Sequence, residues 1–145
     1  MNDFIEQRII LAVRGLLTGR VNELLRGIDF SVPIIEFGEH SCGYAVAPVI
    51  TLNTCERTEK ERIIRQDAYS LTITFSLPET PESELHCYAY AGAVSKAVYE
   101  DPCLSGVVDK AIVTGKVYKF PKKKNCGEAW DVVISLRLTI ERITE

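Results

Sequence analysis

The sequence predicts an α+β fold, with a mostly antiparallel sheet and two helices packed on one face, in the order α-β-β-β-α-β-β. Two stretches of alternating residues and one helix rich in small residues predict this class. Mainly apolar residues occupy every second position from Asp67 to Leu77 and again from Trp130 to Ile140. Because side chains alternate across a strand, each stretch has one face to bury and one face for solvent. Glu82 to Glu100, between these stretches, has the pattern of a helix.

The first part of the chain predicts one helix, one short turn and one edge strand. Apolar residues recur at helical spacing from Asp3 to Leu17, and a second turn from Val21 to Arg26 closes at Gly27. Val32 to Phe37 is apolar enough for a short strand. Pro33 has no backbone N–H, so this strand is expected at the edge of the sheet or at a strand start.

A long hairpin is predicted next. Pro48 to Thr54 is a strand candidate, and a charged passage from Glu56 to Arg62 follows it. Since this passage lies between two strand signals, we expect it to form the hairpin tip. The return strand then starts near Ile63 and runs through Leu77.

A second helix and a final hairpin complete the chain. Ser83 or Thr80 is placed to cap the helix that runs to Glu100. Val107 to Phe120 and Trp130 to Ile140 form the two arms of the last hairpin. The connections between strands are short, so antiparallel pairing is expected. The composition has no break, and residues 1–145 are predicted to form a single domain.

Composition narrows the class of protein. The chain has 145 residues, 46% of them hydrophobic, and this suits one globular domain with its own core. A formal charge of -3 argues against a protein that coats nucleic acid through a broad basic surface. No apolar run approaches the ~20 residues that span a bilayer, and we expect neither a secretory signal nor a membrane partner. The cysteines are odd in number and scattered, which favours reduced thiols in a reducing interior; they are Cys42, Cys55, Cys87, Cys103 and Cys126.

Two pairs of histidine and cysteine are candidate sites of chemistry. His40 and Cys42 share a loop, and His86 and Cys87 are adjacent at the start of the second helix. A zinc site needs four converging ligands, whereas adjacent helical residues diverge by about 100°. We expect no metal, no cofactor and no catalytic residues. A cysteine nucleophile with a histidine base stays an alternative that no spacing specifies.

Two charged segments allow a structural and a functional interpretation. The carboxylates of Glu56–Arg62 alternate with basic residues, which suits a solvated hairpin tip or a zone of salt bridges between subunits. Lys122, Lys123 and Lys124 form a basic tip in the last hairpin. This tip is either a solvated turn or a weak phosphate contact.

The layout resembles a known family of structural proteins. A helix leads to a short strand and a long hairpin, whose return arm reads RQDAYSLTITF from Arg65 to Phe75. A helix rich in alanine and tyrosine follows, and a hairpin closes the chain. This order resembles the tail terminator (tail completion) proteins of long-tailed bacteriophages and related phage-like particles. The resemblance covers nearly the whole chain, and the cysteine-containing stretch from Glu36 to Ala47 departs from it.

The resemblance implies a small α+β subunit that forms a ring, commonly a hexamer, on the head-proximal end of the tail tube. Such a ring stops polymerisation of the tube and presents the surface that joins the head. The implied partners are other copies of the chain, the tail tube protein and the head–tail connector protein, with non-specific contact to passing DNA. The implied location is the virion tail, after assembly in the cytoplasm of a bacterial host.

If this ring forms, two sets of residues are predicted to contact neighbours. The first lies on the charged hairpin and the short edge strand, at the interface with another copy or with the tube: Arg57, Lys60, Arg62, Arg65, Ile34 and Ile35. The second lies on the lysine tip, facing the lumen and its DNA: Lys122, Lys123 and Lys124. Two alternative functions stay open, a head–tail connector or neck adaptor and a small cysteine-dependent enzyme.

Overall fold

The computed structural model describes residues 4–28, 32–38, 45–122 and 127–143. Its helices and strands in these residues are α1 (Ile5–Leu16), α2 (Asn22–Arg26), β1 (Val49–Glu59), β2 (Ile64–Leu77), α3 (Ser83–Glu100), β3 (Lys110–Lys119) and β4 (Trp130–Ile143). The predicted α+β class is confirmed. The order is α-β-β-α-β-β, one strand fewer than predicted.

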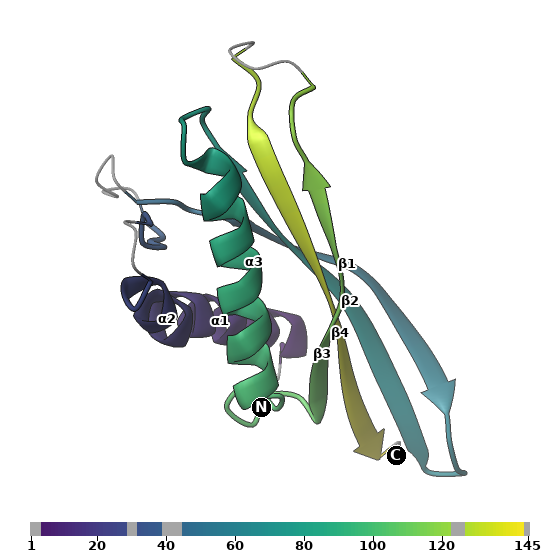
Figure 1. Cartoon of the computed structure of the whole chain (residues 1–145). Helices are drawn as coiled ribbons and strands as arrows, with labels where there is room; N and C mark the ends of the chain where they lie inside the picture. Colours follow the sequence, from purple (N-terminus) through teal and green to yellow (C-terminus); the bar gives the residue numbers. More distant parts are fainter. Residues whose placement is uncertain (1–3, 29–31, 39–44, 123–126, 144–145) are drawn as a thin grey trace.

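The four strands form one antiparallel sheet in the order β1-β2-β4-β3. Figure 1 shows the helices on one side of this twisted sheet and the β1–β2 hairpin projecting beyond them at the lower right. The central pair, β2 and β4, is in register along its full length, from Ile64 opposite Ile143 to Leu77 opposite Trp130. β1 and β3 are therefore the two edges of the sheet in the described residues.

The predicted alternation of the two central strands is confirmed. In β2 the odd positions from Asp67 to Leu77 are buried, and in β4 the even positions from Val132 to Ile140 are buried. These side chains form the core together with one face of α3, where the Phe75 and Tyr90 rings stack with centroids 4.5 Å apart. Small side chains on that face of α3 allow the helix to lie close to the sheet.

The N-terminal helix is longer than predicted. A wider π-type turn, Leu17–Val21, joins α1 to α2 without a break. The buried apolar residues of this helix are spaced four apart: Ile5, Ile9, Val13, Leu17, Val21 and Leu25. In a regular α-helix, a spacing of four drifts about 40° around the axis at each step. A turn with i→i+5 hydrogen bonds reverses this drift, so the stripe keeps facing the core. No helix in the described residues is both long enough and apolar enough to cross a bilayer.

The predicted edge strand from Val32 to Phe37 is wrong, because this segment is bound to α2 instead of to the sheet. The buried side chain of Asn22 accepts a 2.8 Å hydrogen bond from the Ile35 N–H and donates a 2.9 Å bond to the Ile35 carbonyl. An amide side chain here takes the place of a neighbouring strand. The segment forms only an isolated parallel bridge between Ile35 and Val46.

The first hairpin has a shorter tip than predicted. β1 does not end at Thr54 but continues through the charged residues to Glu59, which lies opposite Arg65. The turn itself is closed by hydrogen bonds from the N–H groups of Lys60 and Glu61 to the Ile64 carbonyl. Alternating charges are compatible with a strand because its two faces are both solvated at this end of the sheet.

The two hydrogen bonds between Asn22 and Ile35, here called the Asn22 clamp, predict a large loss of stability when this one side chain is removed. Replacing Asn22 by alanine leaves both backbone groups of Ile35 buried without a partner, and we expect a loss of about 1–3 kcal/mol in the free energy of unfolding. Urea denaturation measures this loss. Asn53→Ala is the matched control, because the Asn53 side chain is exposed and makes only a 3.4 Å bond to Thr72; we expect a change within about 0.5 kcal/mol. Equal stability of the two variants would contradict the clamp.

Candidate functional site

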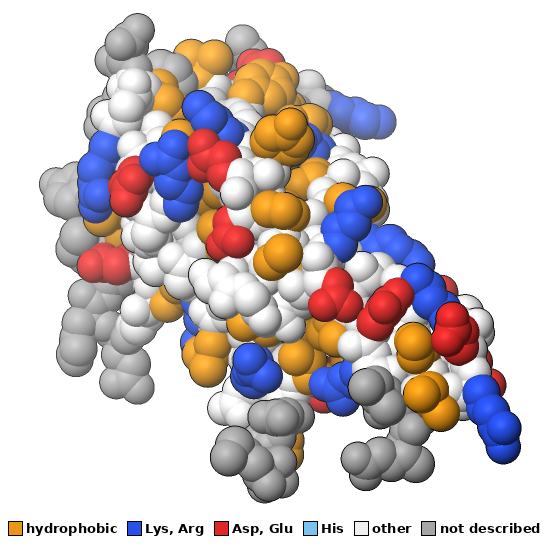
Figure 2. All heavy atoms as spheres, turned by 90° about the horizontal axis from the view of Figure 1, so that it is seen from below, with side chains coloured by type: hydrophobic (Ala, Val, Ile, Leu, Met, Phe, Trp, Pro, Cys, Tyr) orange, Lys and Arg blue, Asp and Glu red, His pale blue; other side chains and the backbone are white. Residues whose placement is uncertain are grey.

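Four of the predicted interface residues gather at the β1–β2 hairpin end of the sheet. Arg57, Lys60, Arg62 and Arg65 lie on the end of β1, in the turn and at the start of β2. Figure 2, which views the molecule from below, shows acidic and basic side chains interspersed over the part that projects to the right. The structure thus brings these four residues together on one projecting arm.

A buried carboxylate organises this arm. Asp67 is 1% exposed, and its side chain accepts a 3.0 Å hydrogen bond from the Arg57 guanidinium across the hairpin. The Arg65 guanidinium lies 4.0 Å from the other carboxylate oxygen. The hydrogen bond to Asp67 raises the pKa of Arg57 above its ordinary value. Arg57 therefore neutralises a buried charge within its own chain, in addition to any contact with a neighbour.

Two further bonds attach the arm to the rest of the protein. The Lys60 ammonium lies 2.6 Å from a Glu141 carboxylate oxygen on β4. The Tyr69 hydroxyl donates a 2.7 Å hydrogen bond to Glu6 on α1, and burial, followed by this bond, raises the pKa of Tyr69. Arg62 is exposed in the turn. The first bond lies within the sheet, and the second connects β2 to α1.

The other predicted site residues lie elsewhere. Ile35 is in the core with both backbone groups bonded to Asn22, and Ile34 is half-buried beside it. The prediction for these two isoleucines depends on an open strand edge from Val32 to Phe37, and this edge is not formed. Lys122 is exposed at the end of the chain segment after β3, while Lys123 and Lys124 lie outside the described residues.

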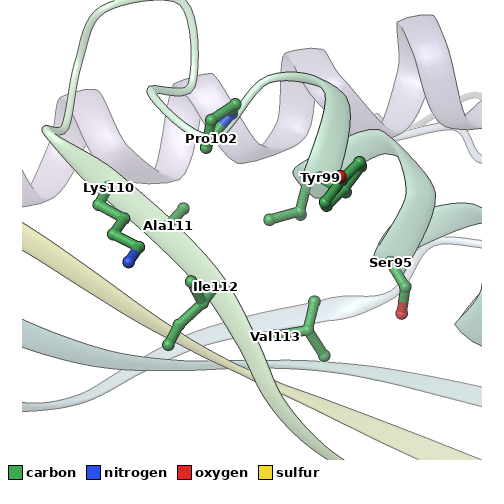
Figure 3. A pocket seen from close by; sticks show the side chains of 8 residues that line it. Ser95, Tyr99, Pro102, Lys110, Ala111, Ile112 and Val113 are labelled. Atoms are coloured by element: carbon green, nitrogen blue, oxygen red, sulfur yellow. The ribbon is translucent and has the colours of Figure 1, made fainter.

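Sequence reasoning missed a groove between α3 and the edge strand β3. It has a volume of about 420 Å³, is open to solvent and is mostly apolar. Figure 3 shows Ser95 and Tyr99 on the helix side, Pro102 beyond the helix end, and Lys110 to Val113 along the strand. Tyr99 is 87% exposed at its rim. Among the apolar residues of α3, Leu85, Tyr88 and Tyr99 lie outside the core, and of these three Tyr99 lies at the groove.

Both sheet edges are open in the part of the chain that the structure describes. β1 pairs only with β2, and β3 pairs only with β4. Every second residue of an edge strand points its N–H and C=O away from the sheet, where another strand can bind them. Each edge also carries one irregularity, at Asn53 in β1 and at Thr114 in β3. Ladder pairing continues on both sides of each bulge, so each edge offers two segments for pairing.

The histidine and cysteine candidates do not form a recognisable reactive site in the described residues. Burial raises the pKa of Cys87 to about 11, so little thiolate exists at neutral pH. His40 and Cys42 lie outside the described residues. Among the residues that are described, no three histidine, cysteine or acidic side chains come together in a group that could hold a metal ion.

Comparisons with known proteins add no assignment. A scan against protein-family models finds no match. No curated protein matches the chain either.

The ion pair between Arg57 and Asp67 predicts that removing Arg57 alone destabilises the protein more than removing both charges. Arg57→Gln leaves a buried carboxylate without its hydrogen-bond donor, a situation that costs about 1–3 kcal/mol for the buried group. We expect a lower midpoint in urea denaturation, and we expect Arg57→Gln/Asp67→Asn to recover most of it. Lys60→Gln is the control, because it breaks an ion pair in which both side chains are 47% exposed and should change stability by less than about 0.5 kcal/mol. A double variant as unstable as the single one would argue against this pairing.

The buried thiol predicts a slow reaction with alkylating reagents. Cys55 and Cys103 are exposed, whereas Cys87 is buried. A pKa raised from 9.0 to about 11 lowers the thiolate fraction of Cys87 near neutral pH about 100-fold. The burial of the side chain slows the alkylation reaction further. Iodoacetamide labelling followed by peptide mass mapping measures the three rates, and that of Cys87 should keep rising with pH up to about 11. Fast labelling of Cys87 at pH ~7 would instead support an activated cysteine.

Proposed function

We propose that this protein is a structural subunit of a phage or phage-like particle. It forms a ring on the head-proximal end of the tail tube, ends polymerisation of the tube and provides the surface on which the head is joined. Its partners are other copies of itself, the tail tube protein and the head–tail connector protein. Its place is the virion tail, after assembly in the bacterial cytoplasm.

The observation that carries this proposal is the one-sided sheet. The helices lie against one face, and β1 and β3 are edges with no further strand among the described residues. A subunit that uses two different edges makes head-to-tail contacts, and these close into a ring when each contact adds a fixed rotation. The charged arm projects beyond this body and is suited to contacting an adjoining ring of the tube or the connector.

The lysine tip has a secondary part in the proposal. Lys122 is exposed and follows the end of β3 that lies away from the charged arm. Lysines there would contact passing DNA through its phosphates, without any reading of sequence. Such contacts are weak and salt-dependent, as a conduit for DNA requires.

The proposal predicts a defect in tail length. An in-frame deletion in a strain that produces the particle should give tails of variable and excessive length that lack heads, because nothing ends polymerisation. Electron microscopy of lysates measures tail length and head attachment. Expression of the intact protein in trans is the control and should restore tails of uniform length.

Two other outcomes would contradict the proposal. Tails of normal length that fail to join heads would favour a neck adaptor. Normal, head-bearing tails would exclude both structural roles and return attention to an activity outside particle assembly.

A further inference from the structure

We propose that the β3 edge of one copy binds the β1 edge of the next, with Lys110 of the first copy facing Glu56 of the second. This pairing would continue the four-stranded sheet from subunit to subunit. The inference rests on the proposed function for its biological role, since it names the contact by which the ring is built. The pairing itself is argued from strand direction, register, charge and the apolar groove.

Strand direction is compatible with contact between unlike edges. A sheet of four antiparallel strands has edges that run in opposite directions, so β1 and β3 are antiparallel to each other. A second copy placed beside the first in the same orientation therefore presents β1 antiparallel to β3. The combined sheet stays antiparallel throughout, and the helices of both copies stay on the same side.

The register of the sheet places a lysine and a glutamate on one row. Lys110 lies opposite Thr139, Thr139 opposite Ala68, and Ala68 opposite Glu56. If the neighbouring copy continues these rows, Lys110 lies directly opposite its Glu56. Both residues are exposed, and Lys110 also lines the edge of the groove beside α3. Oppositely charged residues at directly opposed positions stabilise an antiparallel pair.

The unpaired charges of the two edges are complementary. The β3 edge carries Lys110, Lys116 and Lys119, and no ion pair is seen for them in the described part of the chain. On the β1 side, Glu56 and Glu59 likewise have no ion pair with another described residue. The basic residues next to them are mostly engaged, because Arg57 binds Asp67 and Lys60 binds Glu141. The charges on β1 that are free to pair with a neighbour are therefore more acidic than the composition of the strand suggests.

The same register joins apolar residues on the helix side. Ala111 shares a row with Cys55, and Val113 shares a row with Leu52. Continued into a neighbour, these rows place Leu52 and Cys55 of the second copy along the open side of the groove between α3 and β3. The groove and the exposed Tyr99 at its rim would then be covered by β1 of the neighbouring copy.

Charge also disfavours pairing of like edges. A register that brings the lysines of two β3 edges level opposes like charges, and so does a register that brings Glu56 of two β1 edges level. Like charges in directly opposed positions destabilise a strand pair. A two-fold dimer through either edge is therefore less favourable than head-to-tail assembly, which uses both edges of every subunit.

A charge exchange tests this contact. Sedimentation velocity of the purified protein at ~100 µM and low ionic strength should show an assembly larger than a dimer. Lys110→Glu and Glu56→Lys should each weaken association about fivefold to tenfold, because attraction becomes repulsion. The double variant Lys110→Glu/Glu56→Lys should restore association to within about threefold of the original, and added salt should reduce all these differences.

Controls keep the test decisive. Arg8→Glu makes the same charge change as Lys110→Glu, but on an exposed position of α1, and should leave association within about twofold. Circular dichroism verifies that each variant is folded, and the neutral Lys110→Gln should have a smaller effect than Lys110→Glu. A wild-type protein that stays monomeric, single variants without effect, or a double variant without recovery would each overturn the inference.

The result is separable from the test of function. Rings that depend on Lys110 and Glu56 would support this contact even if deletion of the gene left tail length unchanged. Conversely, uncontrolled tail growth in the deletion strain, together with a charge exchange that has no effect, would keep the function and remove this interface.

Discussion

The pairing of β2 with β4 is the constraint on which the rest of the structure depends. Each strand has 14 residues, and their register is continuous from one end to the other. Because the register is fixed, the apolar positions of both strands meet on the same face, and a slip of one residue would expose them all. The helices must cover that face, and β1 and β3 can only be added outside the central pair. The two open edges are a direct consequence.

The local parts of this fold could be predicted from the sequence, and the parts that depend on distant partners could not. Alternation gave β2 and β4, and helical spacing gave α1 and α3, because those signals are contained in the segments themselves. Val32–Phe37 has the composition of an edge strand, yet Asn22, which is 13 residues from Ile35, occupies its hydrogen bonds. Nothing in the sequence near Ile35 indicates this side chain. The additional length of β1 was also hidden, since its charged residues are paired through the ladder with β2.

The same limitation applies to the candidate site. A run of alternating charges predicted a contact zone at the hairpin, and the structure does gather those residues on one arm. The number of basic residues on the arm overstates the positive charge that is free to bind a partner. Asp67 already binds Arg57, 10 residues away in sequence, and Glu141 binds Lys60, 81 residues away. A buried carboxylate needs such a partner to remain ionised at low cost. The groove beside β3 was missed because Tyr99 and Ile112 are separated by a loop and meet only in the folded chain.

Open edges normally expose a protein to uncontrolled association, and soluble sheets counter this with lysines, bulges and short edge strands. Both edges of this sheet use such devices, with lysines on β3 and a bulge in each edge strand. The two bulges lie at nearly the same level of the sheet, beside the row of Leu71 and Leu136. They divide each edge into two segments, and regular pairing within the chain continues on both sides of each bulge. In the proposed contact, each edge binds the opposite edge of another copy, where the unpaired charges are complementary.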